Sequence, residues 1–328
     1  MGTSRSSPDD RTVEEQSDQS GLSEEQEQIP RSRNEAEVAA EDTCEQESEE
    51  AKVSENEGKK VAERREEVRD ALEGELEIEE EHIYGSLTRG TLVGPLDQDS
   101  DTDVMFVLDR DKHGDWMRDP DNGPRNSLRR VKRSLQNDPR FKDAEISIDR
   151  NVVAIQFNDF TVEVAPAFRQ GDDYVIPNTY QEGSGWVRTN PRQYKNQFEA
   201  VNNSRNGNLA KLARLAKKYN ENTGKNISSY HMEVMAYDFI RSRSYQDEPI
   251  DKLVDQFFEQ LPERLSSGTY DPATGQKIDD GLQNEQRENA ISDARSAREK
   301  LRQARESKNK NENNAEKHYE EVVDGDIE

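Results

Sequence analysis

Residues 83–108 constrain the fold more than any other part of the chain. The apolar run at residues 104–108 is typical of a buried strand, and Asp101 and Asp103 stand at its start. Successive side chains point to opposite faces of a strand, so these two carboxylates share a face and can share a cation. Burying both is costly unless a positive charge lies between them. Magnesium is the obvious candidate, because it takes carboxylate oxygens together with substrate phosphates.

A short apolar strand precedes this run and is expected to end in Gly85-Ser86. A glycine lets the backbone come close to a phosphate, where the following N–H and the serine hydroxyl can donate hydrogen bonds to it. The segment therefore predicts a phosphate site near a cation site.

The ordered pattern resembles a known family. Gly85-Ser86, Arg89-Gly90-Thr91 and the Asp-x-Asp strand resemble the polymerase-beta-like nucleotidyltransferases. Within these, the chain is most similar to the branch that holds the 2′-5′-oligoadenylate synthetases, archaeal CCA-adding enzymes and bacterial cGAS/DncV-like nucleotidyltransferases. The resemblance covers roughly residues 60–275. It implies an α+β fold with a mixed-sheet catalytic lobe and a helical lobe.

The resemblance also implies a third metal-binding carboxylate on a neighbouring strand, and Glu163 occupies that position within residues 160–168. The family usually has aspartate there, so the longer side chain has to pull back by one methylene. Asp159 is the alternative third ligand: it would point to the same face of the strand, but it flanks a turn. Two ions, Mg²⁺ or Mn²⁺, are expected between Asp101, Asp103 and Glu163.

Three further runs resemble family motifs: W-x-x-T-N-P at 186–191, L-x-K-x-W-N at 215–220 with tyrosine in place of tryptophan, and S-F-x-L-E at 229–233. By that likeness Lys217 reaches the triphosphate, Ser229 approaches the phosphates and Tyr230 lines the base pocket. Lys218 offers the same chemistry as its neighbour, which leaves a solvated lysine as the alternative at 217. The implied nucleotide-binding residues are Gly85, Ser86, Arg89, Thr91, Lys217, Ser229 and Tyr230.

Composition and periodicity divide the chain into four parts. Residues 1–57 are acidic and lack an apolar period, which predicts a disordered tail. A catalytic lobe at 58–180 and a helical nucleotide-binding lobe at 181–275 follow. Residues 276–328 are expected to be a charged helical or disordered tail, with a lone frayed helix favoured over an oligomerising one. Expected helices are 61–76, 125–136, 192–204, 207–222, 228–242 and 249–265; expected strands are 144–149, 152–157 and 160–165; residues 114–124 are expected to be a loop.

The charge balance limits the ligands. A net charge of -25 over 328 residues disfavours a long nucleic acid, whereas nucleoside triphosphates carrying their own magnesium stay acceptable. The acidity resembles that of proteins from salt-loving archaea, although acidic tails could dominate the count. One cysteine, Cys44, gives no disulfide framework. Without a long apolar run or a signal-peptide core, a soluble cytoplasmic protein without membrane association is expected.

The implied function is metal-dependent joining of nucleoside triphosphates into a cyclic or short linear oligonucleotide second messenger, as in anti-phage signalling. The length and charge of the chain disfavour a tRNA substrate and double-stranded RNA sensing. An effector or regulatory protein is a candidate partner. The alternatives are a toxin-like nucleotidyltransferase that modifies a protein or tRNA, and a degenerate nucleotide-binding module.

Overall fold

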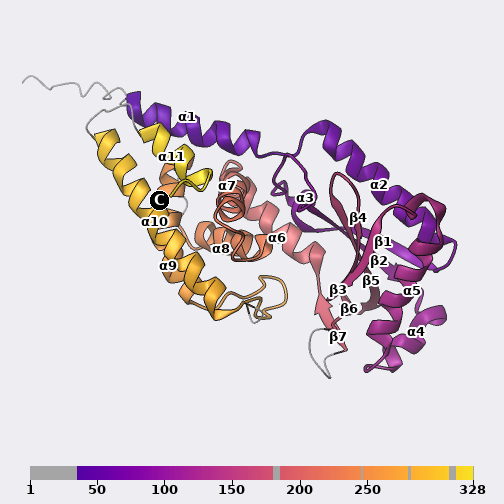
Figure 1. Ribbon diagram of the computed structural model, residues 1–328. Helices are drawn as coiled ribbons and strands as arrows, with labels where there is room; N and C mark the ends of the chain where they lie inside the picture. The colour runs from indigo at the N-terminus through magenta and orange to yellow at the C-terminus, as the bar shows by residue number, and fades with distance from the viewer. Residues whose placement is uncertain (1–34, 180–184, 245–246, 280–281, 310–314, 328) are drawn as a thin grey trace, which may run out of the picture. The chain divides into compact units, whose positions relative to one another are not determined.

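The strand that carries Asp101 and Asp103 lies inside a mixed β-sheet (Figure 1). The computed structural model describes residues 35–179, 185–244, 247–279, 282–309 and 315–327. The strand order is β1-β2-β5-β4-β3, with β6 beside β5 and β7 beside β6. Strands β2 and β5 run parallel, and the other neighbouring strands are antiparallel. The strands are β1 (Ile78–Ile83), β2 (Asp101–Leu108), β3 (Glu145–Asp149), β4 (Val152–Gln156), β5 (Thr161–Gln170), β6 (Asp173–Pro177) and β7 (Trp186–Thr189).

One face of the sheet is covered by two helices, α2 (Glu55–Glu73) and α5 (Gly123–Asn137), which Figure 1 shows alongside the strands. Alternate residues of β2 point to this face, and they pack with the apolar stripes of both helices in one core. The buried members from β2, α2 and α5 are Val104, Phe106, Leu108, Val61, Val68, Ala71, Leu72, Leu128, Val131 and Leu135. The expected helices at 61–76 and 125–136 are thus confirmed, with α2 starting earlier at a capping box between Ser54 and Glu57.

The second core belongs to the helices. The expected helices appear as α6 (Pro191–Asn203), α7 (Asn208–Asn222), α8 (Ser229–Arg241) and α9 (Ile250–Ser266). Helices α7 and α8 pack together around side chains that include Leu212, Leu215 and Phe239. Asn190 caps α6, with Pro191 at the first helical position. The described residues between 35 and 327 belong to one compact unit.

The expectation of a disordered tail over residues 1–57 is wrong for its last part, while residues 1–34 lie outside the described residues. Helix α1 (Glu35–Glu50) buries Ala40 and Cys44 in the helical core. Its acidic side chains pair with lysines of α7: Glu45 with Lys211 at 2.6 Å and Glu47 with Lys218 at 2.7 Å. The helix is therefore held by tertiary contacts that a local apolar period does not reveal.

The C-terminal part is helical, as one of its two expected states, but it is no isolated tail. Helix α10 (Asn284–Asn309) lies against α9 and against α11 (Ala315–Val323). Ala294, Ala297 and Leu301 are fully buried in the helical core. Alanines contribute little apolar area each, which is why the stripe looked too weak in the sequence, yet their small size lets the helices approach closely.

Two smaller expectations also need correction. Helix α4 (Arg110–Arg118) occupies part of the expected loop at 114–124, and α5 begins within it, at Gly123. A Cβ on Gly123 would lie 1.8 Å from the Trp116 carbonyl oxygen, so the glycine permits this close turn. Strand β7 extends the sheet past the expected lobe boundary at residue 180. Among the described helices, none is long and apolar enough to cross a membrane.

Candidate active site

The three predicted carboxylates lie on neighbouring parallel strands. In the register of β2 and β5, Asp103 stands opposite Glu163 and Asp101 opposite Thr161. Met105 and Ala165, two residues further along each strand, belong to the same small core. Since side chains alternate, Asp101, Asp103 and Glu163 all belong to that face of the sheet. The strand pairing thus brings together the carboxylates that the sequence singled out.

The electrostatics of this face favour a cation. Burial raises the pKa of Glu163 to about 8, with further contributions from the charges of Asp103 and Asp101. Burial likewise raises the pKa of Asp103 to about 6; the Arg89 charge opposes this rise and the Asp101 charge adds to it. The pKa of Asp101 is raised by desolvation, against the charge of Lys225. Burial is thus the main cause that raises the pKa of each of the three carboxyls, and a cation bound between them would favour their charged forms.

This donor set fits a hard divalent cation. In the described part of the chain, no three His, Cys, Asp or Glu side chains already converge on a point where an ion could sit. These residues still suit a divalent cation. A bound ion would stabilise the charged carboxylates against the burial that raises their pKa values, and carboxylate oxygens are its preferred ligands. Asp101, Asp103 and Glu163 are the residues that would hold it. The rival Asp159 instead faces Lys60 of α2 at 3.9 Å.

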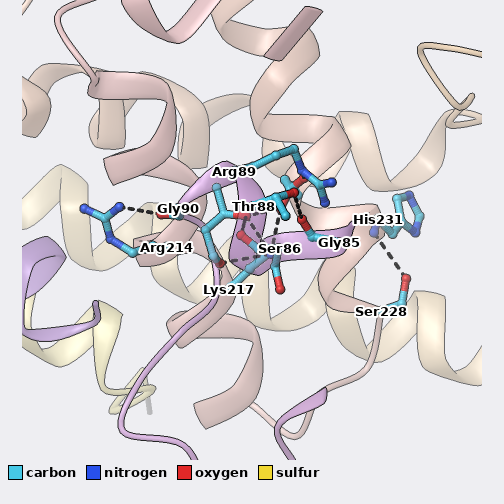
Figure 2. A network of polar contacts seen from close by, with 11 residues as sticks. Gly85, Ser86, Thr88, Arg89, Gly90, Arg214, Lys217, Ser228 and His231 are labelled. Carbon is cyan, nitrogen blue, oxygen red and sulfur yellow. Dashed lines mark hydrogen bonds and ion pairs between the residues drawn. The ribbon is translucent and has the colours of Figure 1, made fainter. Parts of the chain in front are cut away.

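Gly85 brings the backbone against Asp103. Strand β1 ends at Ile83, earlier than the expected end in Gly85-Ser86, because the short helix α3 (Gly85–Arg89) begins there. Gly85 has φ +74, and a Cβ on it would lie 1.9 Å from Asp103 Oδ2. Only glycine accepts both this conformation and this contact. The Thr88 hydroxyl donates to the Gly85 carbonyl at 3.1 Å, which fixes the turn (Figure 2).

Three predicted nucleotide-binding residues meet in the interior. Arg89, Thr91 and Lys217 are buried, and all three contact Glu233 of α8. Arg89 Nε donates to Glu233 Oε1 at 2.5 Å, and Lys217 Nζ donates to Oε2 at 2.7 Å. The Arg89 guanidinium also lies over the ring of Tyr194, 4.8 Å from its centroid. These side chains form a buried polar network that connects the end of α3 with helices α7 and α8 of the helical lobe.

The remaining predicted residues stand at the start of α8. Ser229 is its first residue and is half-buried, while Ser228 caps the helix by accepting from the His231 N–H at 3.2 Å (Figure 2). Tyr230 packs against the helical core, and its hydroxyl donates to Asp271 Oδ2 at 2.6 Å. The bond to Asp271 fixes the orientation of the Tyr230 ring.

Sequence reasoning missed Lys225 and the role of Glu233. Lys225 Nζ donates to the Asp99 carbonyl at 3.2 Å, and its charge opposes the rise that burial causes in the pKa of Asp101. Lys225 has φ 51, an uncommon conformation for lysine. No local motif marks it, because its proximity to Asp101 depends on the docking of the α7–α8 loop. Glu233 was visible in its motif, but its partners are far away in sequence.

Comparison with known proteins found a matching family, a similar sequence and similar folds. Residues 41–202 match the family described as Second Messenger Oligonucleotide or Dinucleotide Synthetase domain. A probable cyclic nucleotide synthase of Bacillus cereus (strain VD146) is 30% identical over 221 residues, which cover 58% of this chain and 64% of that protein. The match thus spans less than two thirds of the length of this relative.

Solved structures share the fold. CdnC of Escherichia coli MS115-1 with ATP superposes with a TM-score of 0.64 at 15% identity, covering 87% of this chain and 97% of the other. Its complex with HORMA-deltaN gives 0.63 at 14% identity, covering 88% and 97%. Vibrio cholerae DncV cyclic AMP-GMP synthase, with the linear intermediate 5′ pppA(3′,5′)pG, gives 0.56 at 14% identity, covering 82% and 75%.

The solved structures define the fold. The chain has the polymerase-beta-like fold of the cGAS/DncV-like enzymes. The matched domain and the Bacillus relative are similarities in sequence to proteins described as synthases of second-messenger oligonucleotides or dinucleotides and of cyclic nucleotides.

Proposed function

We propose that this protein is a metal-dependent nucleotidyltransferase that joins nucleoside triphosphates into a cyclic or short linear oligonucleotide second messenger and releases pyrophosphate. The observation that carries the proposal is the register of Asp103 with Glu163 beside the Gly85 turn. The matched synthetase domain and the Bacillus relative support the same product class. The CdnC structure is a complex with ATP, and the DncV structure is a complex with a linear dinucleotide intermediate.

In this proposal Asp101, Asp103 and Glu163 hold two Mg²⁺ or Mn²⁺ ions. When bound, such ions lower the pKa of an attacking hydroxyl and stabilise the leaving pyrophosphate. The N–H groups and hydroxyl at Gly85-Ser86 donate to the phosphates and align them. Phosphoryl transfer needs alignment and charge neutralisation more than covalent help, so this set of groups is sufficient.

The test is incubation of the purified protein with all four radiolabelled nucleoside triphosphates and Mg²⁺ or Mn²⁺, followed by phosphatase treatment. A phosphatase-resistant small product supports the proposal, and single nucleotides then identify the bases. Label transferred to a protein or tRNA would instead support the toxin-like alternative. The net charge of -25 makes high salt a second assay condition, in line with a proposed origin in a salt-loving organism.

Variants of the proposed ligands check the mechanism. Asp103→Asn is expected to abolish product formation, because it removes the charge that an ion requires. Glu163→Gln is expected to do the same, whereas Glu163→Asp keeps the charge and restores the residue usual in the family. Ser86→Ala is expected to cost about 2–3 kcal/mol of transition-state stabilisation, the scale of one oriented donor. Wild-type turnover in Asp103→Asn would refute the mechanism.

We propose anti-phage defence in the cytoplasm as the setting, with an effector or regulatory protein as partner. The HORMA-deltaN complex of CdnC supports a search for a regulator. The proposed partner is tested by measuring product formation with and without candidate proteins from neighbouring genes. A regulator is expected to change the rate of product formation, and an unrelated acidic protein is not.

A further inference from the structure

Residues 267–279, which directly follow α9, form a hairpin loop. Tyr270 and Lys277 pair across it as an antiparallel bridge. The Asp271 N–H donates to the Gln276 carbonyl at 2.7 Å, and Asp271 Oδ1 accepts from two N–H groups of the turn at 2.7 and 2.9 Å. An aspartate that binds its own turn in this way is held in one orientation. Its other oxygen, Oδ2, can therefore orient a group that donates to it.

The hairpin loop contacts two consecutive residues in the first turn of α8. The Tyr230 hydroxyl donates to Asp271 Oδ2 at 2.6 Å, and His231 Nε2 lies 2.7 Å from the Thr269 hydroxyl oxygen. The ring of Tyr230 also meets that of Tyr194 edge to face, with the ring centroids 5.7 Å apart. A ring that is held at its hydroxyl and at one side has little freedom to turn. The hairpin loop thus helps to set where the Tyr230 ring lies.

One arginine of α10 holds the hairpin loop at both of its ends. Arg287 Nη1 donates to the Leu265 carbonyl, in the last turn of α9, at 2.5 Å, and Nη2 donates to Asp279 Oδ2 at 2.7 Å. Asp279 is buried, and its Oδ1 accepts from the Thr269 N–H at 3.3 Å. Because a guanidinium presents its donors in a rigid fork, these two bonds fix the ends of the loop relative to each other. Polar contacts therefore connect α10 to Tyr230 through the loop.

We propose that the hairpin loop is the positioning element for Tyr230, and that Arg287 of α10 acts through this loop on the affinity for the nucleotide base. The inference rests on the proposed function for its ligand, a nucleoside triphosphate whose base lies against Tyr230. Its structural core, a loop held in place by Arg287, applies to the nucleotide-free protein. The C-terminal helices would then contribute to nucleotide binding as well as to the helical core.

Hydrogen exchange of the nucleotide-free protein tests the structural core. Arg287→Met keeps an apolar stem and removes the guanidinium, so the hairpin loop is expected to open more often. The amides of residues 271–278 should exchange at least about tenfold faster, while β2 keeps its protection. Arg302→Met is the matched control in the same helix, because Arg302 pairs with Glu299 and Glu306 at the surface instead. Unchanged exchange at residues 271–278 in Arg287→Met would overturn the proposal.

Arg287→Lys covers the case in which Arg287→Met fails to fold. A lysine keeps the positive charge beside Asp279 but lacks the fork that also reaches the Leu265 carbonyl. Exchange at residues 271–278 is expected to be about threefold faster than in the wild type. Wild-type exchange in this variant would mean that the double contact does not hold the loop, which contradicts the proposal.

Kinetics test the role of the Tyr230 hydroxyl. Tyr230→Phe keeps an aromatic ring for the base and removes the bond to Asp271. It is expected to raise the KM for nucleoside triphosphate about fivefold and to change kcat less than about twofold, because a displaced ring weakens binding of substrate and transition state alike. Arg287→Met should show the same division between KM and kcat, and Arg302→Met should keep wild-type kinetics. Equal KM values for wild type and Tyr230→Phe would overturn the proposal.

Inorganic tripolyphosphate separates the base from the phosphates, because it carries phosphates but no base. Its inhibition constant is expected to stay within about twofold of the wild-type value in Tyr230→Phe and in Arg287→Met. An inhibition constant that rises in step with the KM would place the effect at the phosphate site, which overturns the proposal. A wild-type protein without product would refute the proposed function, while the exchange result would still decide the structural core.

Discussion

At the scale of single residues, the proposed site depends on close approaches that allow little substitution. Gly85 combines a left-handed backbone with an Asp103 carboxylate oxygen where a Cβ would stand. Sequence reasoning chose this glycine for its approach to phosphate; the structure adds its approach to Asp103. Gly85 therefore affects both the proposed phosphate site and the proposed cation site.

Gly85→Ala is expected to lower the turnover rate by about a hundredfold or more, because the methyl group displaces Asp103 by an ångström or so. Product formation per unit time measures this. Gly171→Ala is the matched control, since Gly171 has a similar φ of +66 but no atom within 4 Å of an added Cβ. The control should lose about 1 kcal/mol of stability and keep its turnover. Equal losses of turnover in both variants would contradict the explanation.

His231 provides a pH-dependent contribution to stability. Burial lowers its pKa from 6.5 to about 4; the Asp279 charge opposes the change and the Arg287 charge adds to it. Its Nε2 lies 2.7 Å from the Thr269 hydroxyl oxygen. The unfolded chain binds the proton more readily, so this contribution is present above pH 6.5 and is lost as the pH falls towards 4.

His231→Gln is therefore expected to flatten the fall in unfolding free energy between pH 6.5 and 4. Urea unfolding of both proteins at several pH values measures the difference. Parallel curves for wild type and variant would show that His231 does not titrate in this way.

At the scale of elements, the terminal helices changed most between expectation and structure. Helix α1 is acidic on the surface and places Ala40 and Cys44 in the core, and α10 buries mainly alanines. Strong periodicity predicted α7 and α8 correctly, because their stripes hold leucine, methionine and aromatic residues. Weak stripes of small residues become helices only when a partner surface covers them.

Leu301→Ala tests whether α10 belongs to the core. Leu301 is fully buried, so the cavity left by the substitution is expected to cost about 2–4 kcal/mol of unfolding free energy. Denaturant titration measures it. Gln303→Ala, at an exposed position of the same helix, should change the value by less than about 0.5 kcal/mol. A frayed, unpacked helix would give equally small effects at both positions.

At the scale of the whole molecule, the net charge is the main electrostatic feature. A charge of -25 repels itself in the folded state, although local ion pairs such as Lys211 with Glu45 offset part of the repulsion. The ion pairs between carboxylates of α1 and lysines of α7 show that part of the excess negative charge helps to hold α1 in place.

Raising KCl from 0.1 M to 1 M shortens the screening length from about 10 Å to 3 Å. We expect the thermal unfolding midpoint to rise by several degrees, since long-range repulsion is screened more than short buried pairs. Differential scanning calorimetry measures this, with uncharged sucrose at equal osmolality to separate screening from solvent exclusion. A midpoint that falls with salt would mean that surface ion pairs outweigh the repulsion.

The sequence by itself determined strands β1 to β5 of the sheet, though not β6 and β7, and the carboxylates on β2 and β5, because period-two alternation and a lone acidic residue among valines are local signals. It also placed Gly85, Asp103 and Glu163 in one expected site. Only the tertiary structure decided that Arg89, Thr91 and Lys217 converge on Glu233, and that α1 and α10 complete the helical core. The physical reason is that these contacts join residues remote in sequence, whose pairing depends on burial and charge across the folded chain.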